Sequence, residues 1–566
     1  GIKVMKRPEK KIHRREFLEN IGKAAGSSVM IRALVAMGLG SGISSCGSSS
    51  AEATPSPSLG NNNSSTGSSS NPSAQQPFSL GNFTSQKSPR PGDWPANSGT
   101  GKSVTILGGG IAGMTCAYEL QKLNYSVSIL EATERAGGRN RTIRSGDVVN
   151  ELNSSQTCMF DNDNELYFNP GPARIAHSHE FLLGYCREFG VELENFTNRN
   201  YAALIHSTSA FSGKPQVAKT VLSDTRGNIA ELLATAINQN ALDAELTETD
   251  KGRILSMLRQ YGDLNRDTLK YEGSSRAGFS GQENIGSRDR DTRISARKLI
   301  EYLVDGFPHW ATNHPEGINQ QPSMLQPKGG MDKIARAFYA RISPSSFISE
   351  AIVKQIRKIT EGVKIVYEKG GVSYEVESDY CICTIPATVL KDIENDFSSD
   401  HQSEISSFQY SNATKIAFQS RRFWEQDNSI YGGISYTNQD ITQIWYPNNA
   451  LGANKGIIVG AYMWGYNAQI TFSDQSPQQR IDSVVSQGTN LHSNYQNEVS
   501  NGISVAWRNI PFQLGAYGLS SASTLLTPDD NIFFAGEHLS QLSGWQEGAI
   551  LSAYHAINEL TKKVHA

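Results

Sequence analysis

The sequence predicts an α/β fold built on a Rossmann-type βαβ unit, and three observations support this. An apolar run at residues 104–107 ends at the turn Gly108-x-Gly110-x-x-Gly113. An amphipathic stretch follows at residues 111–123, and a second apolar run at residues 127–130 ends at Glu131. A strand, a glycine turn, a helix, a strand and an acidic residue in this order are typical of a dinucleotide-binding unit.

Each feature of this unit has a physical task in dinucleotide binding. Gly108 permits the tight turn, Gly110 lets a pyrophosphate approach the backbone, and Gly113 lets the helix pack closely on the strand. The N-terminus of the helix would face the phosphates. The Glu131 carboxylate can accept hydrogen bonds from both ribose hydroxyls, which argues against a 2′-phosphorylated cofactor.

A second glycine turn, Gly137-Gly138-Arg139, follows the acidic residue closely. The two turns together resemble the signature of the flavin amine oxidase superfamily, and the resemblance covers about residues 101–566. It implies a discontinuous Rossmann-type FAD-binding domain, a mixed-sheet substrate domain and a helical lobe. In this part of the chain it implies FAD contacts from Gly108, Gly110, Ile111, Ala112, Gly113, Glu131, Ala132, Gly138 and Arg139.

The composition is that of a large globular chain. Its 566 residues are 38% hydrophobic, enough for two to four domains. The formal net charge is −3 and no basic tract occurs outside the N-terminus, so composition gives no argument for nucleic acid as a partner.

Residues 1–46 have the features of an export signal. Arg14-Arg15 belongs to a twin-arginine pattern, and a weakly apolar stretch follows at residues 24–43. The segment ending at Cys46 resembles a lipoprotein cleavage box with Cys46 as the lipidated residue; the alternative is an ordinary signal end with a chance Cys. The Ser-, Asn-, Gly- and Pro-rich residues 47–98 predict a disordered linker. We expect a periplasmic, cell-surface or secreted protein, lipid-anchored if Cys46 is modified.

The other five cysteines have scattered positions and no metal-ligand spacing with His, so we expect no metal site. Buried free thiols are the simplest interpretation, although export would permit one disulfide. They are Cys116, Cys158, Cys186, Cys381 and Cys383.

A Gly-x-x-Arg stretch, Gly171-Pro172-Ala173-Arg174, opens a predicted helix that runs to Phe189. It resembles a stretch of the L-amino acid oxidase branch that lies against the flavin ring, where the Arg binds the substrate carboxylate. The resemblance therefore implies cofactor contacts from all four residues and a catalytic-site role for Arg174. A planar guanidinium recognises a carboxylate through two parallel hydrogen bonds. The alternative role of Arg174 is a salt bridge at the start of the helix.

Residues 201–322 alternate between helical and polar segments, and the family has a helical lobe here. We predict helices at residues 228–237 and 296–304 and a loop at residues 271–292. His309 and His314 receive no role, because solvated loop histidines are the commoner case.

After this lobe the chain resembles the family's return to the FAD-binding domain. Gly329-Gly330-Met331 precedes a predicted helix at residues 334–342. A strand at residues 350–356 follows, in which Val353 matches the family position whose backbone contacts the adenine. A predicted hairpin comes next, with strands at residues 363–367 and 372–376.

Two further residues are assigned to the catalytic site by resemblance. Lys415 begins a strand at the place where amine oxidases hold a water near flavin N5, and a buried Lys without a role is costly. Tyr446 matches a Tyr whose hydroxyl donates to the substrate carboxylate. A core aromatic strand is the alternative for Tyr446, and a one-residue shift would exchange it with Trp445.

The closing motif is an apolar strand at residues 531–535 that ends in Gly536-Glu537, followed by a predicted helix that begins at Gly544 and runs to Leu560. In the family this helix N-terminus points at the flavin O2 carbonyl and stabilises the anionic reduced ring. The resemblance implies non-covalent FAD, because residues 540–543 contain no Cys. It assigns the cofactor contacts to Gly536, Glu537, Gly544, Trp545, Gln546 and Ala549, and the substrate pocket to Gly544 and Trp545.

The sequence thus predicts an FAD-binding domain (residues 99–155, 323–405 and 520–566), a substrate-binding domain (156–200 and 406–519) and a helical lobe (201–322). We expect oxidative deamination of L-amino acids by hydride transfer from Cα to flavin N5, with oxygen as acceptor. The products would be 2-oxo acid, ammonia and hydrogen peroxide, and the rate should rise with pH as the substrate amine deprotonates. The alternatives are a monoamine or polyamine oxidase and a flavin-binding lipoprotein without oxidase activity. We expect small-molecule partners, no nucleic acid, and a homo-oligomer, most simply a dimer.

Overall fold

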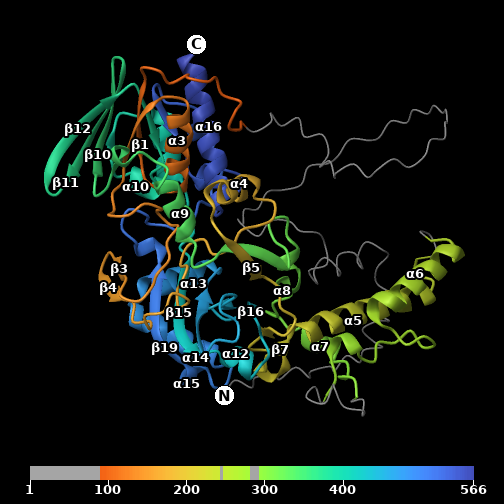
Figure 1. Cartoon of the computed structure of the whole chain (residues 1–566). Helices are drawn as coiled ribbons and strands as arrows, with labels where there is room; N and C mark the ends of the chain where they lie inside the picture. Colours follow the sequence, from red (N-terminus) through yellow and green to blue (C-terminus); the bar gives the residue numbers. More distant parts are fainter. Residues whose placement is uncertain (1–88, 243–245, 281–291, 566) are drawn as a thin grey trace, which may run out of the picture.

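The computed structural model describes residues 89–242, 246–280 and 292–565. The predicted export signal, Cys46 and residues 47–88 of the predicted linker lie outside this description. The described chain forms two sheet-based halves, one above the other in Figure 1, with a helical arm beside the lower half.

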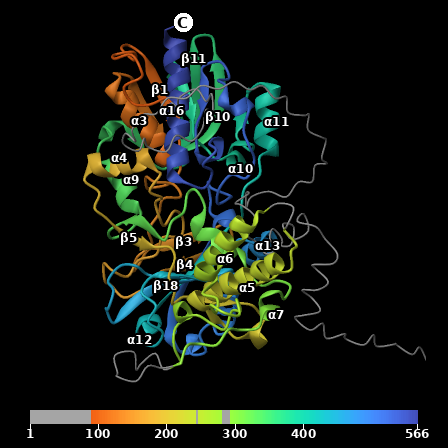
Figure 2. The ribbon, with the colours of Figure 1, turned by 90° about the vertical axis from the view of Figure 1, so that its right-hand side faces the viewer.

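The upper half contains the predicted Rossmann unit. Its sheet has the order β20-β13-β1-β2-β9, and every neighbouring pair is parallel. Helices α3 (Ile111–Lys122) and α16 (Gln546–Val564) pack side by side on it (Figure 2). The strands are β1 (Ser103–Leu107), β2 (Ser126–Leu130), β9 (Phe347–Ile348), β13 (Tyr380–Cys383) and β20 (Ile532–Phe534).

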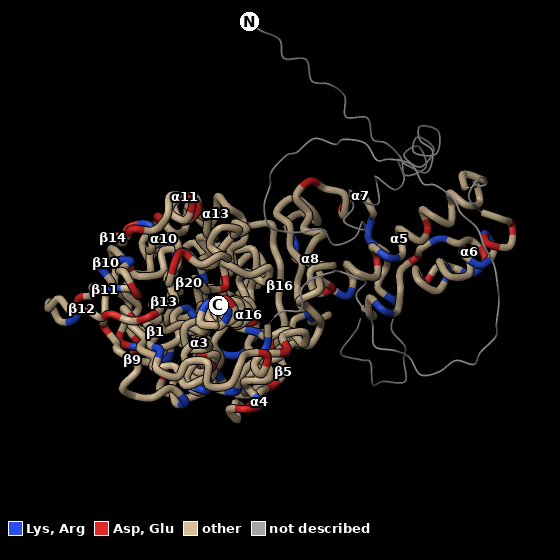
Figure 3. The backbone as a smooth tube through the Cα atoms, turned by 90° about the horizontal axis from the view of Figure 1, so that it is seen from above, with Lys and Arg blue, Asp and Glu red and all other residues tan. Residues whose placement is uncertain are grey.

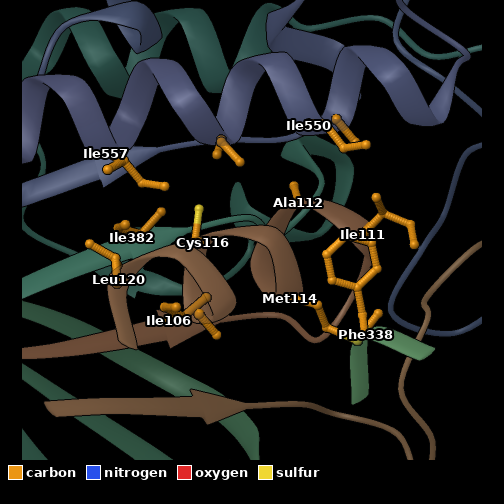
Figure 4. Close-up of a cluster of buried hydrophobic side chains, with 14 of the residues drawn as sticks. Ile106, Ile111, Ala112, Met114, Cys116, Leu120, Phe338, Ile382, Ile550 and Ile557 are labelled. Atoms are coloured by element: carbon orange, nitrogen blue, oxygen red, sulfur yellow. The ribbon is translucent and has the colours of Figure 1, made fainter. Parts of the chain in front are cut away.

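An apolar cluster holds the two helices to the sheet (Figure 4). Cys116 and Leu120 of α3 share this cluster with Ile557 of α16 and with Ile106 and Ile382 of the sheet, and all five are fully buried. Burying one such aliphatic side chain contributes about 1.5–3 kcal/mol. This cluster draws the last helix of the chain onto the first helix of the unit, so distant segments form one domain.

A four-stranded sheet, β12-β11-β10-β14, flanks the parallel sheet. The predicted hairpin is confirmed at one edge of this sheet, with β11 (Gly362–Lys369) and β12 (Val372–Ser378) antiparallel around Gly370 and Gly371. The other strands are β10 (Ile352–Ile359) and β14 (Glu394–Asn395), and the short helices α10 (Ala387–Leu390) and α11 (Ser399–Ser407) follow nearby.

The lower half is organised by a mixed seven-stranded sheet of order β19-β15-β18-β17-β16-β6-β7. Only the β16–β6 pair is parallel. Its strands are β6 (Leu204–His206), β7 (Gln216–Val217), β15 (Thr414–Arg421), β16 (Gly433–Thr437), β17 (Gln443–Tyr446), β18 (Lys455–Tyr462) and β19 (Val499–Ala506). Helices α12 (Phe423–Gln426), α13 (Tyr466–Asp474), α14 (Pro477–Gly488) and α15 (Tyr495–Glu498) accompany it. Thus β6 and β7, inside the range predicted as helical lobe, extend this sheet.

The helical arm consists of α5 (Ala218–Asn238) and α6 (Glu248–Gly262) and extends well away from the body (Figure 3). The helix predicted at residues 228–237 is confirmed and forms part of the longer helix α5. The helix predicted at residues 296–304 shrinks to α7 (Leu299–Tyr302), and α8 (Trp310–Asn313) follows. Half of the loop predicted at residues 271–292, residues 281–291, lies outside the described residues.

Two antiparallel strand pairs connect the halves. They are β3 (Val148–Glu151) with β4 (Ser154–Thr157), and β5 (Leu193–Thr197) with β8 (Ser323–Pro327). The buried carboxylate of Glu151 forms a two-bond ion pair with Arg480 of α14, at 2.7 and 2.8 Å, which fixes the first pair to the lower half. Helix α9 (Asp332–Tyr339) follows the Gly-Gly-Met segment, as predicted.

Two local predictions are wrong. The helix expected from residue 171 begins only at Glu180, as α4 (Glu180–Phe189), because Ile175 pairs with Leu325 in an extended bridge. The linker does not reach residue 98, because Trp94 is buried and packs edge-to-face on Tyr554, with ring centroids 5.6 Å apart.

The five described cysteines are all buried free thiols, as expected. Burial raises the pKa of each thiol, Cys383 to about 12. Among the described helices none combines the length and apolar character needed to cross a bilayer.

Candidate functional site

A cavity of about 1220 Å³ is lined by residues of both halves. Of the residues predicted to bind the cofactor, all but Gly113 line it: Gly108, Gly110, Ile111, Ala112, Glu131, Ala132, Gly138, Arg139, Gly171, Pro172, Ala173, Arg174, Val353, Gly536, Glu537, Gly544, Trp545, Gln546 and Ala549. Gly113 lies behind the wall, where a Cβ would come 2.0 Å from the carbonyl oxygen of Gly108. Its predicted role in close packing therefore matches its surroundings.

The glycine turn presents backbone to the cavity. Gly108 has φ +105°, which strains any residue with a side chain, and a Cβ on Gly110 would meet nothing within 4 Å. The space in front of Gly110 is therefore open for a ligand. The first residues of α3, Ile111 and Ala112, line the same space with the positive end of the helix dipole.

The Glu131 carboxylate is fixed by the chain itself. Its Oε2 accepts the Gly109 N–H at 2.7 Å, and its Oε1 accepts the backbone N–H and hydroxyl of Thr133 at 2.8 and 2.7 Å. A carboxylate oxygen has more than one acceptor site. Glu131 is thus positioned before any ligand binds and keeps capacity for ribose hydroxyls.

An ion pair joins the two ends of the sequence at this site. Arg139 Nη1 donates to Glu537 Oε1 at 2.6 Å, and the Gly544 N–H donates to Glu537 Oε2 at 2.8 Å. Burial opposes ionisation of Glu537, but Arg139, His538 and the Gly544 N–H together hold its pKa below the ordinary value. Glu537 therefore binds the Gly-Gly-Arg turn to the segment before α16.

The N-terminus of α16 also faces the cavity, through Trp545, Gln546 and Ala549. The Asn140 side chain donates from Nδ2 to Gln546 Oε1 at 2.5 Å. Asn140 is 2% exposed, and its Oδ1 has no hydrogen-bond partner within the described chain. Such an oxygen is costly unless a ligand or water satisfies it. This donor and acceptor set, the open glycine turn and two helix N-termini fit FAD.

Arg174 is a buried cation at the other end of the cavity. Its Nη1 donates to Asn198 Oδ1 at 2.9 Å, and the guanidinium lies over Trp445, 4.7 Å from the ring centroid. Burial lowers its pKa. No carboxylate among the described residues lies within ion-pair distance of it, so the alternative of a helix-start salt bridge is wrong. Asn198 in turn donates to Gln320 at 3.0 Å and is held in place.

Lys415 also lines this end and is 4% exposed. Its Nζ donates to the Gly171 carbonyl oxygen at 2.7 Å and lies over the rings of Trp445 and Tyr462, at 4.7 and 4.6 Å from their centroids. Burial and the charge of Arg174 lower the pKa of Lys415 to about 7. Lys415 therefore lines the cavity beside Trp445, with an ammonium that releases its proton easily.

The prediction that Tyr446 contacts the substrate is wrong. Its hydroxyl bonds Ser435 and His492, at 2.7 Å each, in an apolar cluster on the far face of β17. Trp445 faces the cavity instead. Successive residues of a strand point to opposite faces, so a shift of one position exchanges the two side chains.

The sequence did not indicate that two histidines belong to the cavity wall. His314, which received no role, lies with its ring 4.7 Å from that of Trp464, and burial together with Arg174 lowers its pKa to about 3. His179 precedes α4 and packs edge-to-face on Trp545 at 4.8 Å. No local pattern marks either residue, because both lie in irregular segments that reach the cavity only through tertiary packing.

Known proteins resemble this chain over most of its length. A family model described as flavin containing amine oxidoreductase matches residues 111–560. An L-amino-acid oxidase of Gloydius halys is 26% identical, over 81% of this chain and 89% of that protein. A flavin-dependent L-tryptophan oxidase of Lentzea aerocolonigenes is 25% identical, over 81% and 98%.

Solved structures show the same fold at low sequence identity. Cyclohexylamine oxidase from Brevibacterium oxydans has a TM-score of 0.53 at 16% identity, over 82% of this chain and 100% of that one. Putrescine oxidase bound to putrescine has a TM-score of 0.52 at 16% identity, over 82% and 99%.

Proposed function

The chain belongs to the family of flavin-containing amine oxidoreductases, and on that premise we propose that it is an FAD-dependent L-amino acid oxidase. The observation that carries this proposal is Arg174, a buried guanidinium that faces the cavity without a carboxylate partner in the described chain. A buried cation without a counter-charge is strongly unfavourable. A substrate carboxylate would supply that charge through two parallel hydrogen bonds.

The surroundings of Arg174 favour an anionic group over a second cation. Three acidic residues line the cavity, and two of them, Glu131 and Glu537, are bound at the dinucleotide end. The third, Asp392, follows α10 next to the sheet of β10. The field around Arg174 and Lys415 is therefore positive, which opposes a diamine or polyamine.

The aromatic walls support the same choice. An amine substrate would need ring faces for cation–π contact. The faces of Trp445 and Tyr462 already carry the chain's own cations, Arg174 and Lys415, within 4.6–4.7 Å of their centroids. Arg174 thus offers a carboxylate a partner, whereas these two rings already bind cations of the chain and are not free for an ammonium.

In the proposed reaction the chain would bind and orient the substrate, and non-covalent FAD would supply the two-electron oxidation at Cα, with oxygen as the final acceptor. Arg174 would fix the carboxylate, with Asn198 holding the guanidinium in place. Trp445 and Trp545 would exclude water from the substrate. The released imino acid would hydrolyse to a 2-oxo acid and ammonia.

The test is anaerobic bleaching of the visible flavin absorbance of the holoenzyme. L-amino acids should bleach it, whereas their decarboxylated amines and D-enantiomers should not, and oxygen should restore the colour with hydrogen peroxide formed. Bleaching by the amines would favour a monoamine or polyamine oxidase. No bleaching by any of them would contradict the proposal and leave a flavoprotein without this oxidase activity.

A further inference from the structure

His179 is a buried polar side chain that the fold leaves unsatisfied. The residue is 1% exposed, and neither ring nitrogen has a hydrogen-bond partner anywhere in the described residues. It lines the cavity. Burial, together with nearby His177, lowers its pKa to about 4, so the imidazole is neutral near pH 7. A neutral imidazole has one donor and one acceptor nitrogen to offer.

The ring has no structural task in starting α4. Glu547 of α16 performs that task, because its carboxylate accepts the N–H groups of Phe181 and Leu182 at 3.0 and 2.8 Å. His179 makes no capping bond with its side chain. Leaving a buried polar group unpaired costs free energy, so the cavity side is where its partner belongs.

A chain of contacts places His179 at the Arg174 end of the cavity. The neighbouring Ser178 hydroxyl donates to Asn319, and the next residue, Gln320, accepts from Asn198, which holds Arg174.

Trp545, against which the His179 ring packs, also contacts the apolar cluster that contains Trp445. The imidazole therefore lies on the cavity wall beside Trp545, at the end where Arg174 and Trp445 lie.

We propose that His179 selects substrates by a hydrogen bond to a neutral polar group on the side chain. This inference rests on the proposed function, since Arg174 would hold the carboxylate and leave the side chain free to reach the second wall. The favoured class is L-amino acids with a carboxamide or phenol, over apolar side chains of similar size. Arg174 and Lys415 disfavour cationic side chains at this end.

The test compares two matched pairs, L-glutamine with L-methionine and L-tyrosine with L-phenylalanine. For the holoenzyme we expect kcat/KM to favour the polar member of each pair. In His179→Leu this preference should fall about tenfold, the effect of one neutral hydrogen bond, with little change for the apolar members. His179→Gln, which restores a donor and an acceptor, should recover part of it. His177→Leu, an exposed position two residues earlier, is the control and should leave the preference unchanged.

Calorimetric titration of the same pairs into holoenzyme whose flavin has first been reduced with dithionite, under anaerobic conditions, separates this inference from the proposed function, because substrate oxidation then adds no heat to binding. Tighter binding of the polar amino acid of each pair, lost in His179→Leu, would support the role of His179. This holds even if none of the four amino acids were oxidised, a result that would contradict only the oxidase proposal. An unchanged preference in His179→Leu would overturn it and indicate that a bound water satisfies the ring. Loss of FAD from His179→Leu with an unchanged preference would also overturn it, because the imidazole would then serve the cofactor.

Discussion

The two ends of the cavity differ in how the chain treats its buried polar groups. At the dinucleotide end these groups bind one another: Glu131 is held by backbone N–H groups, and Arg139 is paired with Glu537. At the other end Arg174 has no carboxylate partner and His179 no hydrogen-bond partner within the described chain. The charged groups of the first end are paired by the fold, which leaves a neutral oxygen, Asn140 Oδ1, for a ligand there, whereas the second end keeps an unpaired charge on Arg174. Rigid placement suits a resident cofactor, and unsatisfied groups suit a substrate that enters and leaves.

The largest effect on activity should come from removing the unpaired positive charge of Arg174. Arg174→Gln keeps a donor for Asn198 but leaves a substrate carboxylate without a counter-charge. We expect kcat/KM for L-amino acids, followed by hydrogen peroxide formation, to fall about 10²- to 10³-fold. Arg253→Gln, at an exposed position of α6, is the control and should leave it unchanged. An equally small effect in both variants would remove the basis for the carboxylate site.

Removing the ion pair between Arg139 and Glu537 at the dinucleotide end should reduce stability instead. Glu537→Gln preserves shape but leaves Arg139 buried without its partner. We expect the free energy of unfolding in urea to fall by about 3 kcal/mol and FAD to dissociate more readily. Glu192→Gln removes an exposed carboxylate whose partner, Lys328, is exposed as well, and should change neither quantity. If Glu537→Gln retained stability and FAD but lost substrate affinity, our division of the cavity would be wrong.

The sequence predicts the residues of the dinucleotide end far better than those of the Arg174 end, for a physical reason. Gly108, Gly110 and Glu131 work through backbone geometry at fixed spacing, so a local pattern suffices to find them. Gly536 and Glu537 likewise follow directly from the strand that carries them. His179 and His314 reach the cavity because α16 and the sheet pack around their loops, and no local periodicity records that.

Tyr446 illustrates a different limit. The pattern around residues 443–446 predicts a buried strand correctly, and the strand exists as β17. Both of its faces are apolar and aromatic, since Trp445 and Tyr446 enter different clusters. Because a two-sided buried strand lacks the alternation that assigns its faces, sequence alone could not decide which aromatic residue faces the substrate.

The charge of Lys415 gives an effect on stability that depends on pH. Burial and Arg174 lower its pKa from 10.5 to about 7, so between these values the unfolded chain binds the proton more tightly. Stability relative to Lys415→Met should therefore rise by about 1.4 kcal/mol per pH unit from about pH 7 to pH 10 and be flat below. Urea unfolding of both proteins at several pH values measures this difference. If the free energies of unfolding of the two proteins changed in parallel with pH, Lys415 would be solvated in the folded protein.

The smallest effect should come from giving Arg174 the partner that it lacks. Asn198→Asp places a carboxylate 2.9 Å from Nη1, where the amide oxygen now accepts. This internal partner would compete with the substrate carboxylate, so we expect KM for L-amino acids to rise about tenfold while kcat changes less. Asn195→Asp, at an exposed position of the same segment, is the control. If KM stayed constant in Asn198→Asp, a negative charge beside Arg174 would not compete with the substrate carboxylate. The proposal that Arg174 is left unpaired in order to bind that carboxylate would then be wrong.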